Sequence, residues 1–235
     1  MKTLRFALII PAAGSGSRMA NTVPKPYLKI DGTTILEHTI RQFIDIPGLV
    51  QIVIAASKEY HTDIRSFFLD NRRDVKLTVV DGGSERQHSI YNALSALSED
   101  VDLVAVHDAV RPFIDKETIL KCLNRASETG AAITGVPAKD TIKKTDRAVT
   151  IIDTPDRSLL WQAQTPQIFK KEILLEAYNK ALDDQFTGTD DSSLVERLGC
   201  KVTIIEGNRE NFKITYPLDM QLAELLIRER KGADL

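Results

Sequence analysis

Short apolar runs alternate with longer amphipathic stretches along the first part of the chain. The runs are too short for buried helices and end abruptly at polar or glycine residues, which is typical of buried strands. They cover residues 6–10, 50–56, 76–80, 102–106 and 131–136. The stretches between them repeat apolar residues at helical spacing. This order predicts an α/β fold: a Rossmann-like, mostly parallel twisted sheet with helices on both faces.

Residues with strong capping preferences mark the predicted helices. Thr33 or Thr34 can begin a helix that runs to about Ile44, and Asp115 can begin one that runs to about Glu128. Further helices are expected at about 59–69, from the segment after Asp81 to about Leu97, at 171–182, at 192–198 after Thr189 or Asp190, and from Pro217 to about Arg230. Two more strands are expected at 159–165, with Trp161 as a core anchor, and at 201–206.

The pattern changes between Lys139 and Arg157, where polar and apolar residues alternate around turn-forming ones. This alternation predicts a two-stranded hairpin arm at about 140–152. An isolated hairpin with so few large apolar residues cannot form a core of its own. We therefore expect the arm to pack on a second copy of the chain, as a dimerisation element.

A glycine-containing loop follows the first strand. Residues 11–19 read Pro-Ala-Ala-Gly-Ser-Gly-Ser-Arg-Met, and Lys25 follows shortly after. Gly14 and Gly16 let such a loop bring backbone N–H groups close to phosphates, while Arg18 and Lys25 add positive charge. An ordinary turn with solvated basic residues is the structural alternative. The loop lacks the ending of a Walker loop and the third glycine of a dinucleotide-binding loop, which disfavours a nicotinamide-dependent dehydrogenase.

The third strand also ends in a glycine-containing segment, residues 81–89. Carboxyl ends of parallel strands meet at one edge of a sheet, where ligands bind. The glycine pair in this segment can let a flat base approach the backbone, and Ser89 can hydrogen-bond it. A turn with Ser84 as a helix cap explains the same residues equally well.

The fourth strand runs into residues 107–112, which include Asp108 and Arg111. These two side chains can pair with each other, or the carboxylate can hold Mg²⁺ while the arginine binds an anion. Polar residues at three successive strand ends favour the ligand-binding alternative. His107 is expected to be a structural hydrogen-bonding residue.

Composition narrows the class of protein. A chain of 235 residues with 43% hydrophobic residues suits one domain, 1–235, with a protruding arm at about 139–157. A net charge of -2 provides no basic field for nucleic acid. Cys122 and Cys200 are far apart and are expected to be reduced, buried thiols. No signal peptide and no run long enough to span a membrane is seen, so we expect a cytoplasmic protein with no membrane partner.

The ordered set of these segments resembles the 2-C-methyl-D-erythritol 4-phosphate cytidylyltransferase family over nearly the whole chain. The matching segments are Pro11 to Met19, Pro24-Lys25, Asp81-Gly82-Gly83 with Glu85-Arg86, His107 to Pro112, Asp140-Thr141, Trp161 with Thr165-Pro166-Gln167, and Asn211 to Thr215. The resemblance implies a fold of the nucleotide-diphospho-sugar transferase type. It also implies cytidylyl transfer from CTP to methylerythritol phosphate, releasing pyrophosphate, in non-mevalonate isoprenoid biosynthesis. Mg²⁺ and a homodimer whose arms reach into the partner's site are further implications.

The resemblance also implies a role for individual residues by position. Triphosphate binding and transition-state charge stabilisation fall to Arg18, Lys25 and Lys213. Nucleotide binding falls to Ala12, Ala13, Gly14, Gly16, Gly83 and Ser89. The acceptor and the metal fall to Asp108, Arg111, Thr141, Thr165 and, from the partner's arm, Arg157, with Asp108 as the metal ligand.

Pro26 departs from the family pattern, in which Gln is common, and it stiffens the loop after Lys25. The nearest alternative is the ribitol-5-phosphate cytidylyltransferase family, whose first loop usually reads Leu-Ala-Gly-Gly. This chain has Pro-Ala-Ala-Gly at 11–14, which favours methylerythritol phosphate. A non-catalytic nucleotide-binding regulator is an alternative of a different class. Such a regulator could dispense with Arg18, Lys25 or Lys213, yet all three are present.

Overall fold

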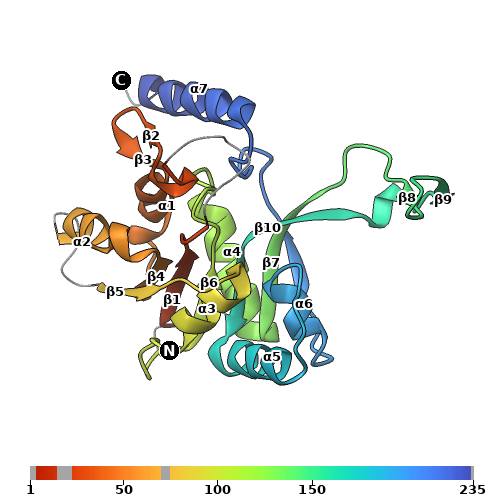
Figure 1. Ribbon diagram of the computed structural model, residues 1–235, viewed down its shortest axis with the longest axis horizontal. Helices are drawn as coiled ribbons and strands as arrows, with labels where there is room; N and C mark the ends of the chain where they lie inside the picture. Colours follow the sequence, from red (N-terminus) through yellow and green to blue (C-terminus); the bar gives the residue numbers. More distant parts are fainter. Residues whose placement is uncertain (1–3, 15–22, 70–74, 234–235) are drawn as a thin grey trace.

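The computed structural model of the protein describes residues 4–14, 23–69 and 75–233, and its centre is a seven-stranded sheet (Figure 1). The strands lie in the order β11-β7-β10-β6-β1-β4-β5. Their bounds are β1 Phe6–Pro11, β4 Leu49–Ala56, β5 Lys76–Asp81, β6 Leu103–Val106, β7 Ala131–Pro137, β10 Trp161–Lys170 and β11 Thr203–Glu206. Strand β10 runs antiparallel to both neighbours, and the other pairs are parallel. The predicted mostly parallel sheet is confirmed.

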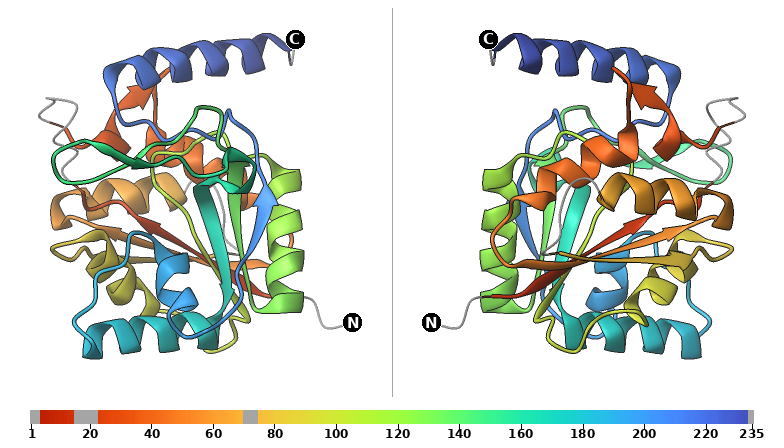
Figure 2. Two further views of the ribbon diagram at one scale, coloured as in Figure 1. Left: turned by 90° about the vertical axis from the view of Figure 1, so that its right-hand side faces the viewer. Right: turned by 90° about the vertical axis from the view of Figure 1, so that its left-hand side faces the viewer.

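Helices cover both faces of this sheet (Figure 2). Their bounds are α1 Ile35–Ile44, α2 His61–Leu69, α3 Arg86–Leu94, α4 Lys116–Thr129, α5 Lys171–Asp183 and α6 Asp191–Glu196. Helices α1, α2 and α4 pack on one face, and α3, α5 and α6 pack on the other. The alternation of side chains in β1 feeds both layers, because Phe6, Leu8 and Ile10 join the first cluster while Ala7 and Ile9 join the second.

The helix starts agree with the predicted caps. Thr34 forms a capping box with Glu37, because its hydroxyl accepts from the Glu37 N–H while the Glu37 carboxylate accepts from the Thr34 N–H. Asp115 accepts from the N–H of Thr118 at 2.7 Å, and Asp190 caps α6. Ser84 does not cap a helix: the residue before α3 is Glu85, and the Ser84 hydroxyl bonds to the His88 ring at 2.9 Å. The turn alternative built on Ser84 as a cap is therefore wrong.

Helix α7, Pro217–Ala233, lies beyond the end of the sheet and packs on a small hairpin (Figure 1). The hairpin is β2 Lys29–Ile30 and β3 Thr33–Thr34, and the short 3-10 helices are Lys25–Tyr27, Lys58–Tyr60 and Arg157–Leu159. Ile214 is buried in this third cluster, and its N–H donates to the carbonyl of Val110 at 3.0 Å. This contact carries the neighbouring Lys213 to the end of β6.

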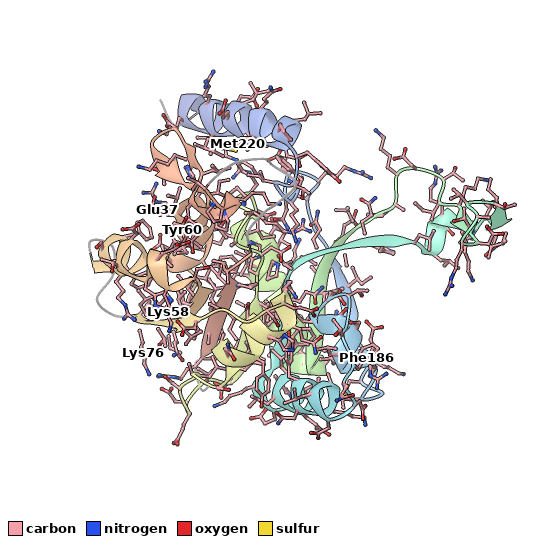
Figure 3. All side chains as sticks on the ribbon, in the orientation of Figure 1. Glu37, Lys58, Tyr60, Lys76, Phe186 and Met220 are labelled. Atoms are coloured by element: carbon pink, nitrogen blue, oxygen red, sulfur yellow. The ribbon has the colours of Figure 1, made fainter. Side chains whose placement is uncertain are left out.

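The arm projects away from the body of the molecule (Figure 1), and its side chains extend into open space (Figure 3). Its two strands are β8 Lys144–Thr145 and β9 Ile151–Asp153, joined by a turn in which Asp146 accepts two backbone hydrogen bonds. Residues 139–154 are all exposed, including the apolar Ile151. The predicted hairpin is present, with shorter strands than the alternation suggested.

Trp161 is not a core anchor. Its side chain is 38% exposed, and the residue pairs with Pro137 where β7 and β10 leave the body toward the arm. The buried part of β10 begins at Gln164. The size and apolar character of Trp161 predicted its burial, whereas its position at the root of a protruding element decides its exposure.

Of the two cysteines, Cys122 is buried and Cys200 is half-buried; both are free.

Within the described residues, every helix is too short or too polar to cross a membrane.

Candidate active site

The three strand ends singled out in the sequence meet at one edge of the sheet around a cavity of about 530 Å³. Its lining residues are Pro11, Ala13, Gly14, Lys25, Pro26, Gly83, Ser84, Glu85, Arg86, Ser89, Asp108, Ala109, Val110 and Lys213. Seven of the predicted site residues are in this set. Strand β1 supplies the first loop, β5 the second and β6 the Asp108 segment, as expected for a parallel sheet.

The first two loops are packed against each other so closely that glycine is required. A Cβ atom on Gly82 would lie 2.1 Å from the Cβ of Ala13, and one on Gly83 would lie 2.3 Å from the Cβ of His88. The backbone ladder extends into both loops, because the Ala12 N–H donates to Ala55 and the Gly82 N–H donates to Ala56. Gly82 thus joins the two loops into one wall of the cavity, Gly83 lets the second loop pack closely on α3, and Ala12 is buried behind the wall.

Ser89 holds the second loop, residues 81–89, in place through its side chain. Its hydroxyl accepts from the Gly83 N–H at 3.0 Å and donates to the Glu85 carbonyl at 3.1 Å. The side chain is almost fully buried, at 3% exposure, yet it lines the cavity. The donor proton of Ser89 is therefore already used, and what the hydroxyl can still offer a ligand is an acceptor lone pair.

Asp108 is the electrostatic centre of the cavity. Its carboxylate lies 3.4 Å from Arg86 Nε, 3.2 Å from Arg111 Nε and 3.1 Å from Lys213 Nζ. Burial alone would raise the pKa of the Asp108 carboxyl, but Arg86, Lys213 and Arg111 outweigh burial and hold this pKa well below its usual range. The carboxylate is ionised at neutral pH and neutralises part of the surrounding positive charge.

His107 is held in one tautomer behind the cavity. Its Nε2 lies 3.0 Å from the Arg111 carbonyl, which can only accept, so Nε2 carries the proton and Nδ1 accepts from the Thr165 hydroxyl at 3.0 Å. The Thr165 hydroxyl in turn accepts from the Asp108 N–H at 3.0 Å. Burial lowers the pKa of His107 to about 4, so the ring is neutral. The predicted structural role of His107 agrees with this geometry.

Thr165 and Arg111 are placed beside the cavity. Thr165 is buried, and its hydroxyl is occupied by His107 and the Asp108 N–H. Arg111 donates from Nη1 to the carbonyl of Asn211 at 2.8 Å as well as to Asp108. Thr165 and Arg111 therefore hold the Asp108 segment in place, and neither is among the described residues that line the cavity.

Thr141 and Arg157 lie on or at the root of the exposed arm and are not among the described residues that line this chain's own cavity. Arg157 Nη1 donates to the Lys139 carbonyl at 2.9 Å. The expected sites Gly16 and Arg18 fall outside the described residues.

Two residues of this region were missed as site residues. Arg86 lines the cavity and forms a bidentate pair with Asp191, with Nη1 and Nη2 at 3.1 and 2.8 Å from the two carboxylate oxygens. Asp191 is completely buried, and the Tyr178 hydroxyl also donates to it. Arg86 lies in the conspicuous segment 81–89 and could have been found there. Asp191 lies 105 residues further on, and no local pattern connects the two.

Over the residues the structure describes, no group of three or more His, Cys, Asp or Glu side chains is arranged to hold a metal ion. Glu85 and Asp108 are the acidic residues that line the cavity, and Asp108 is the buried one. A single carboxylate suits Mg²⁺, which is commonly bound by one or two carboxylates together with substrate phosphates and water.

The comparisons with known proteins agree with one another. Residues 6–229 match the family model of 2-C-methyl-D-erythritol 4-phosphate cytidylyltransferase. The chain is 45% identical to the protein of that name from Solibacter usitatus, covering 96% of this chain and 97% of the relative. It is 42% identical to the one from Caldanaerobacter subterraneus, covering 96% and 100%.

Solved structures show the same likeness. The 4-diphosphocytidyl-2C-methyl-D-erythritol synthase of Anaerococcus prevotii superposes with a TM-score of 0.85 at 32% identity, covering 96% of both chains. The Thermus thermophilus 2-C-methyl-D-erythritol 4-phosphate cytidylyltransferase gives 0.77 at 31% identity, covering 97% of this chain and 100% of the other. The fold, the cavity at the strand ends and these matches over nearly the full length lead to one conclusion: the chain belongs to the 2-C-methyl-D-erythritol 4-phosphate cytidylyltransferase family.

Proposed function

We propose that this chain transfers the cytidylyl group of CTP to the phosphate of 2-C-methyl-D-erythritol 4-phosphate, giving 4-diphosphocytidyl-2-C-methyl-D-erythritol and pyrophosphate. The observation that carries the proposal is the cavity in which a glycine-walled loop pair faces Lys25, Lys213 and the ionised Asp108. Family membership supplies the identity of the two substrates.

The reaction needs no general base. A phosphate monoester is largely dianionic at neutral pH and attacks the α-phosphorus directly. The P–O bond to the β-phosphate breaks as the new P–O bond forms, and its electron pair leaves with pyrophosphate. The neutral His107, with both ring nitrogens already hydrogen-bonded, fits a reaction in which no side chain has to take a proton.

The charge that develops on the phosphate oxygens must be neutralised instead. Lys25 and Lys213 line the cavity and are proposed to bind the triphosphate and stabilise the transition state, together with Arg18. The backbone at Ala13, Gly14 and Gly16 is proposed to receive the phosphates, whereas the N–H of Ala12 already donates to the Ala55 carbonyl and can only support this wall. Gly83 and Ser89 also line the cavity and are proposed to contact the cytosine base of CTP.

Asp108 keeps Lys213 and Arg111 in place before the substrates bind, since both cations lie within 3.2 Å of its carboxylate. An incoming triphosphate competes for these cations and releases the carboxylate. Asp108 is proposed as the protein ligand of Mg²⁺, with nucleotide phosphates completing the coordination. When bound, this ion would supply further charge neutralisation at the phosphates.

We also propose a homodimer formed through the arm. Exposed apolar side chains on and around the arm support it, including Val149 at 79% and Leu159 at 78% exposure. In such a dimer the acceptor would contact Thr141 and Arg157 of an arm from the other subunit. The cytoplasmic location expected from the sequence stays a prediction.

Substitution of Lys25 tests the catalytic role of the cavity. Lys25→Ala is expected to lower kcat about a hundredfold while CTP binding weakens much less, because the cation acts mainly on charge that develops in the transition state. Stopped assays of pyrophosphate release and calorimetric CTP titrations measure the two quantities. Lys29→Ala, an exposed lysine in β2, is the matched control. An unchanged kcat for Lys25→Ala would remove this residue from the mechanism.

A further inference from the structure

A second cavity, of about 270 Å³, lies beside the candidate active site. Lys213 lines both cavities, and Arg111 and Arg209 add two more cations to the second one. Val136 and Phe212 give it an apolar wall. Among the described residues that line it, none is acidic. A concave site with three cations and no carboxylate is suited to an anion on a short carbon chain.

Arg209 is the cation of this set whose charge is not balanced. Arg111 and Lys213 are both paired with Asp108. Arg209 makes one neutral contact, from Nη2 to the Pro137 carbonyl at 3.3 Å, and no carboxylate within the described ranges forms an ion pair with it. The Arg209 guanidinium therefore keeps both its uncompensated charge and most of its donors for a ligand, whereas Arg111 is already paired with Asp108 and donates to the Asn211 carbonyl.

The backbone that carries Arg209 is fixed to the sheet. The N–H of Gly207 donates to the Gly135 carbonyl at 2.8 Å, and the Gln164 side chain donates to the Asn208 carbonyl at 3.1 Å. Asn208 then accepts from the Glu210 N–H at 2.9 Å, which closes the turn around Arg209. An arginine on a turn held at three points reaches the cavity with little loss of backbone entropy on binding.

We propose that Arg209 binds the phosphate of the acceptor in this second cavity. The proposal rests on the proposed function, because it assigns this cavity to the substrate that must lie next to the nucleotide. Lys213 forms the boundary between the cavities, so a phosphate held by Arg209 and Lys213 stands beside the triphosphate. The apolar wall accommodates the carbon chain of the acceptor.

Arg209→Ala tests the proposal by separating the two substrates. We expect the KM for methylerythritol phosphate to rise about tenfold, the loss of one charge-assisted contact, with kcat and the KM for CTP within about twofold of wild type. Arg209→Lys keeps the charge and is expected to restore most of the acceptor affinity. The control is Lys201→Ala, an exposed cation just before β11, at the opposite end of that strand from Arg209.

A second measurement is independent of turnover: binding of inorganic phosphate to the CTP-free protein, followed by calorimetry. Wild type is expected to bind phosphate several-fold more tightly than Arg209→Ala, and Lys201→Ala is expected to match wild type. Equal phosphate affinities and equal acceptor KM values in Arg209→Ala and wild type would overturn the proposal. A rise in the KM for CTP alone would overturn it as well, by placing Arg209 at the nucleotide. If wild type released no pyrophosphate yet phosphate binding still depended on Arg209, the proposed function would fail while the anion site stood.

Discussion

Asp108 sets the charge of the site because three cations from three different segments converge on one carboxylate. Arg86 comes from α3, Arg111 follows β6, and Lys213 comes from the segment before α7. Its burial makes each pair stronger than a surface ion pair, since solvent screens it less. The cations are therefore held in position in the ligand-free protein, which in the proposed mechanism lowers the reorganisation needed in the transition state.

His107 predicts a pH dependence of stability. Its pKa is about 4 in the folded chain and near 6.5 when exposed, so between these values the unfolded chain binds a proton that the folded chain does not. The free energy of unfolding is fully retained above pH 6.5 and falls as the pH drops toward 4, by about 3 kcal/mol in total. Urea unfolding from pH 7 to pH 4 measures this slope.

His107→Gln is expected to remove that slope, because glutamine does not titrate in this range. The exposed His88→Gln is the matched control and is expected to keep it. A slope that persists in His107→Gln would show that another group carries the pH dependence.

At the scale of elements, the Arg86–Asp191 pair joins α3 to the start of α6 across one face of the sheet. The pair is bidentate, and the Tyr178 hydroxyl of α5 completes the coordination of the Asp191 carboxylate. Three helices are thereby tied together directly beneath the wall of the candidate active site.

Asp191→Asn is expected to lower the free energy of unfolding by about 3 kcal/mol, because it removes the bidentate one of the two carboxylates that pair with the Arg86 guanidinium. Asp183→Asn, an exposed residue at the end of α5, is expected to change it by less than about 0.5 kcal/mol. Urea denaturation of the two variants gives both values. A loss below about 1 kcal/mol in Asp191→Asn would mean that solvent replaces the pair easily.

Sequence patterns predicted the elements well where the determinants are local. The Thr34 and Asp115 caps and the buried strands β1 and β6 depend on neighbouring residues, and their predictions are confirmed. The antiparallel direction of β10 was not predicted, because it depends on how the arm returns the chain to the sheet.

The residues of the candidate site divide in the same way, into those that local sequence patterns reveal and those that depend on contacts between distant segments. The residues at the ends of β1, β5 and β6 were found because a parallel sheet brings such ends together. Asp191 and Arg209 were not found, because their significance comes from contacts with segments far away in the sequence. Trp161 was misjudged because its size indicated burial while its place at the root of the arm decided otherwise.

At the scale of the whole molecule, the arm is the element that projects from the packed body (Figure 1). It carries Thr141, while Arg157 lies at its root, and residues 139–154 are exposed throughout (Figure 1). An isolated hairpin of this length is only marginally stable, so we propose that a second subunit supplies packing contacts for the arm.

Mixing two impaired variants, Lys25→Ala and Arg157→Ala, tests whether Arg157 acts on the other subunit. Lys25→Ala alters the cavity of the candidate active site and keeps the arm, whereas Arg157→Ala keeps this cavity and alters the arm. Random assortment of subunits gives one intact site in each mixed dimer, so roughly a quarter of wild-type activity is expected after co-refolding. Activity no higher than the mean of the two separate variants, or sedimentation as a 26.2 kDa species alone, would place both residues in one chain.

The most direct test of the whole account is pyrophosphate release by the purified protein with CTP and Mg²⁺, given methylerythritol phosphate in one reaction and ribitol 5-phosphate in another. Release that is strong with methylerythritol phosphate and weak with ribitol 5-phosphate is the predicted result. A preference for ribitol 5-phosphate would keep the chemistry and contradict the acceptor. Release with neither acceptor, in protein that binds CTP, would contradict the catalytic account itself.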